Sequence, residues 1–479
     1  MSKLNGDILY LIFKELEDDK MTLISCLSVN KIWCEIIIPI FWNDPWKYLS
    51  KGREKLLLEV IISHLSDESR NNLSKYLIKS FKKPLFNYIS FCKILNLIEI
   101  EKIIYISIDY NFLLDIFLLF KEEIFNLFIN NKAKFTHLYM PYGFNYQIHL
   151  IPGAKESFSE IEFLNFNAGI DEKILIGLSQ ICKSIKKLDF FIQFFVKANN
   201  NDGIIRLIDS QKKLNQVYFE LDYDNVDELF CKNLENSLIK HGKTIEYIKI
   251  VDQPITNILS YFENLKILEV IGINYNALWD KLATVSLPFL QLLNVKNVPI
   301  NVLTSLIEKT KGYLNEIKIG YIDHDEIDNK RLIRAIYQNC PNLKYLKLLI
   351  KDSNIWELEK LLINCKYLNG LFIMTEDHID WVELFKILTR SSPTSLFKFK
   401  FYFSVAPRPE FLKLFFDNWK GRHSMLLHTI PEGEYVTVDI DYCDMIEKYK
   451  AEGVIKVYHN SILGVYFEDF EWIRKKNSN

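Results

Sequence analysis

One short pattern of apolar and polar positions recurs along most of this chain. A clear copy has apolar side chains at Leu343, Leu346 and Leu348, and the last two alternate as in a strand that buries one face. Apolar residues then follow at helical spacing over residues 355–365, and the strand pattern restarts at Leu368. A strand, a helix and a second strand within a few tens of residues indicate a repeat array.

The middle apolar residue of the pattern marks each copy of the unit. Consecutive markers are roughly 20 to 30 residues apart, the usual length of a leucine-rich repeat. In three copies a cysteine stands three residues before the first apolar position, which resembles the cysteine-containing type of this repeat. The alternative is an ordinary α/β domain with chance spacing. The markers are Leu138, Leu164, Leu188, Val217, Ile248, Leu268, Leu293, Ile317, Leu346, Leu371 and Phe399.

These copies predict the fold class and its domains. We expect an α/β leucine-rich-repeat solenoid over residues 131–403, with a curved parallel sheet inside and helices outside. Residues 1–48 are predicted to form a separate unit of three helices, and residues 49–130 a helical connector. The pattern is lost after residue 403, so residues 404–479 are predicted to form a C-terminal cap. An earlier, irregular copy is a candidate at Ile103, Ile106 and Ile108.

The N-terminal unit has the pattern of a small docking module. Leu9, Ile12, Phe13 and Leu16 follow helical spacing, and Asn5 stands where a helix cap is expected. Three short helices bury little surface by themselves. The unit is therefore expected to be marginal unless another surface covers its apolar residues.

The amino-acid sequence of this unit also resembles the F-box family. Residues 4–16 are similar to the opening of an F-box, and residues 27–33 to its valine–lysine–tryptophan middle. Phe41-Trp42 is similar to the closing apolar–tryptophan pair. Asn5 is a departure, because the family usually has proline after the first leucine.

The resemblance implies a function as well as a fold. An F-box binds the Skp adaptor, and through it a cullin, so the chain would be a non-catalytic receptor that presents a protein substrate for ubiquitin transfer. The departure at Asn5 motivates an alternative, a leucine-rich-repeat scaffold or sensor outside any ligase. By position, the resemblance implies adaptor contact for Leu4, Ile8, Leu9, Ile12 and Phe13, and a role shared between core and interface for Leu27, Val29 and Trp33.

The outward positions of the strands suggest where a substrate binds. In a leucine-rich-repeat horseshoe, the residue after each marker points outward from the concave face. Lys249, Lys318, Lys347 and Lys400 occupy this position, with Glu269 interrupting them. We expect a local positive surface that favours an acidic or phosphorylated segment of a partner. The alternative is that these lysines are ordinary solvated side chains.

Composition narrows the remaining possibilities. The net charge of −2 gives no global field for nucleic acid or an anionic membrane. The most apolar region, residues 103–129, carries charges that argue against a membrane span. With no signal-peptide pattern and no Cys-x-x-Cys pair, we expect reduced cysteines and a cytoplasmic or nuclear location. The basic run at residues 474–476 is predicted to be a solvated end rather than a localisation signal.

The sequence offers no pattern for catalysis. It contains no glycine-rich phosphate loop, no Gly-x-Ser-x-Gly and no His-Glu-x-x-His, and its nine histidines are scattered. The pairs Asp323/Asp325 and Asp439/Asp441 are predicted to be solvated surface charge. We therefore expect no catalytic residue, no metal and no cofactor. An enzyme with a hidden site stays as an alternative without positive support.

Overall fold

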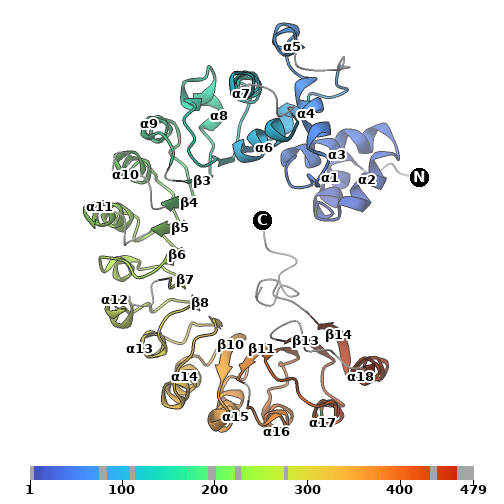
Figure 1. Cartoon of the computed structure of the whole chain (residues 1–479), viewed down its shortest axis with the longest axis vertical. Helices are drawn as coiled ribbons and strands as arrows, with labels where there is room; N and C mark the ends of the chain where they lie inside the picture. Colours follow the sequence, from blue (N-terminus) through green and yellow to red (C-terminus); the bar gives the residue numbers. More distant parts are fainter. Residues whose placement is uncertain are drawn as a thin grey trace. The chain divides into compact units, whose positions relative to one another are not determined.

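The computed structural model of the chain, drawn in Figure 1, describes most of the sequence. Of the positions named above, Leu4, Ile108, Asp439 and the basic run 474–476 lie outside the described residues. The chain divides into an N-terminal unit, Met1–Lys240, and a C-terminal unit, His241–Asn479. The described residues are 5–74, 83–107, 114–167, 169–192, 201–221, 228–273, 279–376, 378–431 and 440–460.

The N-terminal unit begins with helices and continues with alternating strands and helices. Its helices are α1 (Gly6–Glu15), α2 (Lys20–Leu27), α3 (Lys31–Asn43), α4 (Glu54–Ile62), α5 (Asp67–Ser74), α6 (Leu97–Ser107), α7 (Leu114–Phe128), α8 (Ala154–Phe158), α9 (Glu172–Ile181), α10 (Asn201–Asp209) and α11 (Glu228–Ile239), with short 3-10 turns η1 (Tyr88–Phe91) and η2 (Ile148–Leu150). Its strands are β1 (Ile94–Asn96), β2 (His137–Tyr139), β3 (Phe163–Asn167), β4 (Lys187–Ile192) and β5 (Gln216–Leu221).

The C-terminal unit repeats the same alternation, and its helices lie on one face of its sheet (Figure 1). Its strands are β6 (Tyr247–Val251), β7 (Ile267–Ile271), β8 (Leu292–Lys296), β9 (Glu316–Ile319), β10 (Tyr345–Ile350), β11 (Gly370–Thr375), β12 (Lys398–Phe403), β13 (Met425–Pro431) and β14 (Ile455–Asn460). Its helices are η4 (Ile258–Tyr261), α12 (Asp280–Thr284), α13 (Ile300–Glu308), α14 (Glu326–Asn339), η5 (Asp352–Asn354), α15 (Ile355–Asn364), α16 (Trp381–Ser391), α17 (Pro409–Trp419) and α18 (Ile440–Ala451).

The strands confirm the predicted fold class. The described strands form a parallel, fourteen-stranded sheet in chain order, as in a leucine-rich-repeat type of solenoid. All eleven predicted markers lie in strands β2 to β12. Neighbouring markers also pair directly, from Leu138 through Leu164 to Val217, and again from Ile248 to Phe399. The apolar pattern therefore predicts the register of the sheet as well as its strands.

The sheet continues beyond residues 131–403 on both sides. Leu95 in β1 pairs with Leu138, and β13 and β14 follow β12 in the same parallel arrangement. The irregular strand suggested at Ile103 and Ile106 is wrong, because both residues lie in helix α6. Two helices, α6 and α7, separate β1 from β2, so that step is longer than the others. Within the described part of the chain, no helix combines the length and apolar character needed to cross a bilayer.

The cysteine position of the repeat links neighbouring repeats. Cys182, Cys340 and Cys365 are fully buried. The Cys182 thiol donates to the carbonyl oxygen of Phe158 at 3.4 Å, and the Cys365 thiol to that of Cys340 at 3.8 Å. Gln211 stands at the same position, and its Nε2 donates to the carbonyl oxygen of Cys182 at 2.9 Å. Small or amide side chains here satisfy buried carbonyl groups between repeats.

Tryptophan side chains join the first three helices to the start of the sheet. The Trp46 indole N–H, just after α3, donates to the carbonyl oxygen of Ile94 in β1 at 2.9 Å. The rings of Trp42 and Tyr88 stack with centroids 4.9 Å apart. The first three helices are therefore attached to the first repeat by specific contacts rather than by a loose linker.

Candidate functional site

Helices α1, α2 and α3 enclose a small core of their own. Leu9, Phe13, Leu23 and Ile37 are its buried members, and the rings of Phe13 and Trp33 meet edge to face with centroids 5.1 Å apart. Leu9 and Phe13 are only 5% and 2% exposed. The structure thus places both residues in the core of the three helices, and their contact with the adaptor stays a prediction. Their spacing of four residues puts them on the face of α1 that packs against the neighbouring helices.

The same three helices expose large apolar side chains. Ile8, Leu11 and Ile12 share the opposite face of α1, and they are 47%, 63% and 43% exposed. Leu27 and Trp33 pack against the core but stay partly exposed. Sequence reasoning missed Leu11, although it lies three residues after Ile8. We call these exposed residues the apolar face: Ile8, Leu11, Ile12, Met21, Ile24, Val29 and Ile32.

Side-chain caps fix the start of each of these helices. The Asn5 side chain accepts a hydrogen bond from the Asp7 backbone N–H at 3.4 Å, as the sequence predicts for a cap. Asp19 and Asn30 cap α2 and α3 in the same way. Asn5 therefore performs a structural role at the position where the F-box family usually has proline.

In the C-terminal unit, the strand register aligns most of the predicted lysines. Lys318 pairs with Lys347, Lys347 with Phe372, and Phe372 with Lys400. His428 in β13 continues the line beside Lys400. We call these five residues the lysine row. They point away from the buried marker side chains, because successive side chains of a strand alternate between faces.

The lysines of this row are buried, whereas the sequence analysis expected them to form an outward positive surface. Lys318, Lys347 and Lys400 are 4%, 3% and 2% exposed. The Lys318 ammonium pairs with the Glu316 carboxylate at 2.6 Å. The ammonium groups of Lys347 and Lys400 lie 4.9 Å and 5.9 Å from the centroid of the Phe372 ring, within cation–π range. Phe372 thus lies between two positive charges.

Apolar side chains surround the lysine row. Leu349, Phe372 and Met374 form a buried cluster, against which Tyr345, Tyr402 and Ile430 pack. Burial, then the charge of Lys400 and of His459, lowers the pKa of His428 to about 4. His428 is therefore neutral near pH 7, and the lysines carry the positive charge of this row.

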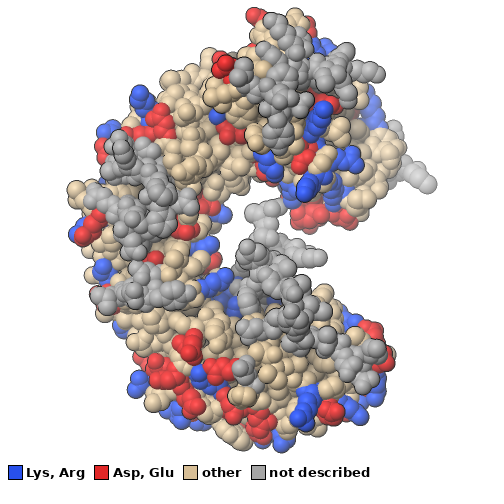
Figure 2. All heavy atoms as spheres, viewed as in Figure 1, with Lys and Arg blue, Asp and Glu red and all other residues tan. Residues whose placement is uncertain are grey.

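The fourth predicted lysine stands apart from the others. Lys249 in β6 is half-buried and has the same register as the row, but Glu269 and Asn294 lie between it and Lys318. The Asn294 amide donates to the Glu269 carboxylate at 2.9 Å. Glu269 therefore offsets positive charge at this end, and the structure brings together three of the four predicted lysines. Elsewhere, acidic and basic side chains are interspersed over the face drawn in Figure 2.

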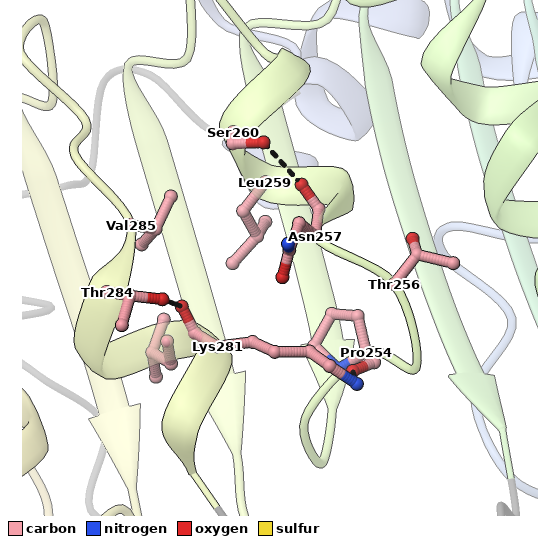
Figure 3. A pocket seen from close by; sticks show the side chains of 9 residues that line it. Pro254, Thr256, Asn257, Leu259, Ser260, Lys281, Thr284 and Val285 are labelled. Carbon is pink, nitrogen blue, oxygen red and sulfur yellow. Dashed lines mark hydrogen bonds between the residues drawn. The ribbon is translucent and has the colours of Figure 1, made fainter.

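A hollow of about 200 Å³ lies between η4 and α12 (Figure 3). Its charged residue is Lys281, whose ammonium donates to the backbone carbonyl oxygens of Pro254, at 3.3 Å, and Ile255. The rest of its lining offers hydroxyl, amide and apolar groups, with no acid–base or nucleophile pair. Among the described residues, no group of three or more His, Cys, Asp or Glu side chains is placed to hold a metal ion. The hollow therefore supports no catalytic hypothesis.

Comparisons with known proteins found matches only among solved structures. No protein-family model matches the chain, and no curated protein matches it. Among solved structures, the chain is similar to one described as the crystal structure of the Rad7 and Elc1 complex in yeast. The identity is 13%, the TM-score is 0.40, and the match covers 61% of this chain and 74% of that chain. A similarity this low carries no statement about function.

Proposed function

We propose that the chain is the substrate-recognition subunit of a Skp–cullin–F-box ubiquitin ligase. Helices α1 to α3 bind the Skp adaptor, the adaptor links the chain to a cullin, and the solenoid binds a protein substrate. The observation that carries the proposal is the apolar face, which exposes seven large apolar side chains on α1, α2, α3 and the turn between α2 and α3. The sequence resemblance of the same helices to an F-box also supports the proposal.

The energetics of the apolar face favour a protein partner. Burying exposed apolar surface against a partner contributes about 25 cal/mol per Å². The three helices have only four fully buried core side chains. A partner that covers the apolar face would also stabilise the helices, since ligand binding to the folded state shifts the folding equilibrium.

The proposed role is positional rather than chemical. The adaptor end fixes the receptor in the ligase, and the substrate end raises the effective concentration of a substrate lysine near the charged enzyme. No cofactor is needed for this role. The cytoplasm or nucleus is the location that fits it.

The test is direct binding of the purified full-length chain to a purified Skp adaptor by calorimetry. We expect binding by the wild type and a loss of about thirtyfold or more in affinity for Leu11→Glu and Ile12→Glu, as for central interface anchors. Leu150→Glu is the matched control, because Leu150 is a 71% exposed leucine in η2. Its affinity should equal that of the wild type.

Two results would contradict the proposal. A folded wild-type chain that does not bind the adaptor would remove the ligase role and favour the scaffold or sensor. Binding that is insensitive to Leu11→Glu and Ile12→Glu would show that the adaptor uses another surface. Circular dichroism on each variant keeps misfolding separate from loss of contact.

A further inference from the structure

Helices α14 and α15 of the C-terminal unit bring three positive side chains to one buried carboxylate. The two helices are neighbours on the helix side of the sheet (Figure 1). Glu357 of α15 is 5% exposed, and its Oε1 accepts hydrogen bonds from Arg334 Nη2 of α14 at 2.9 Å and from Lys360 Nζ at 3.3 Å. The Nζ of Lys330 lies 3.9 Å from the same oxygen. We call these four residues the cation cradle.

The cation cradle carries more positive than negative charge, and its positive groups reach water. The side chains of Lys330, Arg334 and Lys360 are 46%, 45% and 54% exposed. Burial opposes the ionisation of Glu357, but the hydrogen bonds from Arg334 and Lys360 lower its pKa. Within the described part of the chain, the ion pairs of these three cations all run to Glu357. Three positive charges against one negative charge leave a net charge of +2.

The excess charge belongs to the cation cradle rather than to the whole helix surface. Nearby exposed cations each have an acidic partner of their own: Arg331 with Asp328 at 3.9 Å, Lys386 with Glu383 at 3.7 Å, and Arg390 with Glu359 at 2.7 Å. Nucleic acids and anionic membranes bind to extended series of unbalanced cations. A single compact excess of two charges fits one anionic group instead.

Glu357 positions the cations before any ligand binds. Its second oxygen, Oε2, accepts a hydrogen bond from the Tyr337 hydroxyl at 3.3 Å, which fixes the orientation of the carboxylate. The carboxylate in turn holds together three cations that would otherwise repel one another. Because all three lie close to one oxygen, a single phosphoryl group can accept charge-assisted hydrogen bonds from them. Such preorganisation lowers the entropic cost of binding.

An exposed tryptophan lies beside the cation cradle. Trp356 is 56% exposed and precedes Lys360 by four residues in α15, so the two side chains share one face of the helix. Ile363, also 56% exposed, follows Lys360 by three residues on that face. Exposed aromatic side chains beside arginine are typical of the centres of protein interfaces. The surface therefore offers apolar contact that a free phosphate ion would not use.

We propose that the cation cradle binds a phosphorylated serine or threonine in a segment of another protein. The phosphoryl group carries a charge of about −1.5 to −2 at pH 7, which matches the excess of the cradle. Its oxygens accept hydrogen bonds from Arg334, Lys330 and Lys360, and an apolar residue of the segment packs on Trp356. The site shares no residue with the apolar face or the lysine row, so it stands independently of the proposed function. Recognition of this partner is conditional on a kinase.

A peptide library tests the proposal. The full-length chain is offered short fluorescent peptides that have phosphoserine at the central position and mixed residues elsewhere, beside the same library with serine. We expect about tenfold or more stronger retention of the phosphorylated library, because charge-assisted hydrogen bonds require the phosphoryl group. Added salt should weaken this retention. Sequencing of the retained peptides should show apolar residues enriched beside the phosphoserine.

Variants locate the binding site. Lys330→Gln/Lys360→Gln removes the excess charge and leaves Arg334 paired with Glu357, so we expect a folded chain whose retention of the phosphorylated library falls about tenfold or more. Lys386→Gln/Lys413→Gln is the matched control, because it removes two exposed lysines from α16 and α17. Its retention should equal that of the wild type. Trp356→Ala should keep the preference for phosphoserine and lose the enrichment of apolar residues.

Three results would overturn the proposal. The first is equal retention of the two libraries by the folded wild type, and the second is unchanged retention by Lys330→Gln/Lys360→Gln. The third is binding of a single-stranded oligonucleotide or a phosphatidylserine vesicle through the cation cradle where the phosphorylated peptides fail. Circular dichroism checks folding, and Lys360→Gln alone replaces the double variant if that variant does not fold. None of these measurements contains the adaptor, so failure of the proposed function is a separate result.

Discussion

Replacing Phe13 by alanine should unfold the three N-terminal helices while the sheet remains intact. Phe13 is 2% exposed and packs edge to face on Trp33. Truncating a buried phenylalanine to alanine usually costs about 3–5 kcal/mol, from the lost transfer energy and the cavity that remains. The lost aromatic pair accounts for about 0.5–1.5 kcal/mol of such an effect.

This cost is large for so small a core. Whole domains are stable by only about 5–15 kcal/mol, and here Leu9, Leu23 and Ile37 are the only other fully buried members of the described cluster. The loss is therefore comparable with everything that holds the three helices together. The repeats should keep their structure, because each repeat is stabilised mainly by its neighbours.

Hydrogen exchange read by mass spectrometry can measure this difference. For Phe13→Ala we expect lost protection in peptides from residues 6–43 and unchanged protection in peptides from residues 345–350. Ile12→Ala is the matched control, because Ile12 is 43% exposed and surface changes usually cost less than about 0.5 kcal/mol. Full protection of α1 in Phe13→Ala would refute the assignment of Phe13 to the core. Simultaneous loss in both regions would show that the helices and the solenoid unfold together.

Three further predictions concern stability and reactivity. Burial alone would raise the pKa of Glu357, but hydrogen bonds led by the one from Arg334 outweigh burial and lower it from 4.5. Glu357→Gln should therefore cost roughly 1–2 kcal/mol in urea unfolding at pH 7, and the difference should fade as pH falls below 4.5 towards the lowered pKa. Gly153→Ala should lower the melting temperature more than Gly421→Ala, because both positions have positive φ but only at Gly153 would a Cβ collide with the neighbouring backbone. In a native thiol titration the exposed Cys443 should react before the buried thiols, whose pKa burial raises; equal rates would contradict the buried assignment of Cys92, Cys182, Cys340 and Cys365.

The apolar pattern predicted the solenoid well because the marker side chains lie on the same side of the sheet in every repeat, whatever the length of the helices between them. Every marker from Leu138 to Phe399 lies in a strand, although the loops and helices between them differ in length. The pattern missed β1, β13 and β14 at the two ends of the sheet. β1 has only three residues, and Thr429 occupies an inward position of β13. Pairing with a neighbouring strand, which the local sequence does not encode, establishes these strands.

The candidate site was harder to predict because exposure depends on partners elsewhere in the chain. Leu9 and Ile12 are similarly apolar neighbours on α1, and the packing of the three helices decides that Leu9 is buried. Strand alternation correctly placed Lys318, Lys347 and Lys400 in one row, but alternation says nothing about what covers a face.

Because neighbouring strands pair directly, the spacing between strands sets the distances at which an extended ligand that crosses the lysine row can meet the lysines. Strands recur about every 4.8 Å, whereas side chains on one side of an extended chain recur about every 6.8 Å. The two periods coincide at about 14 Å, after three strands and two side-chain periods. Lys318 and Lys400 lie three strands apart, so a ligand with acidic groups at positions i and i+4 would meet both.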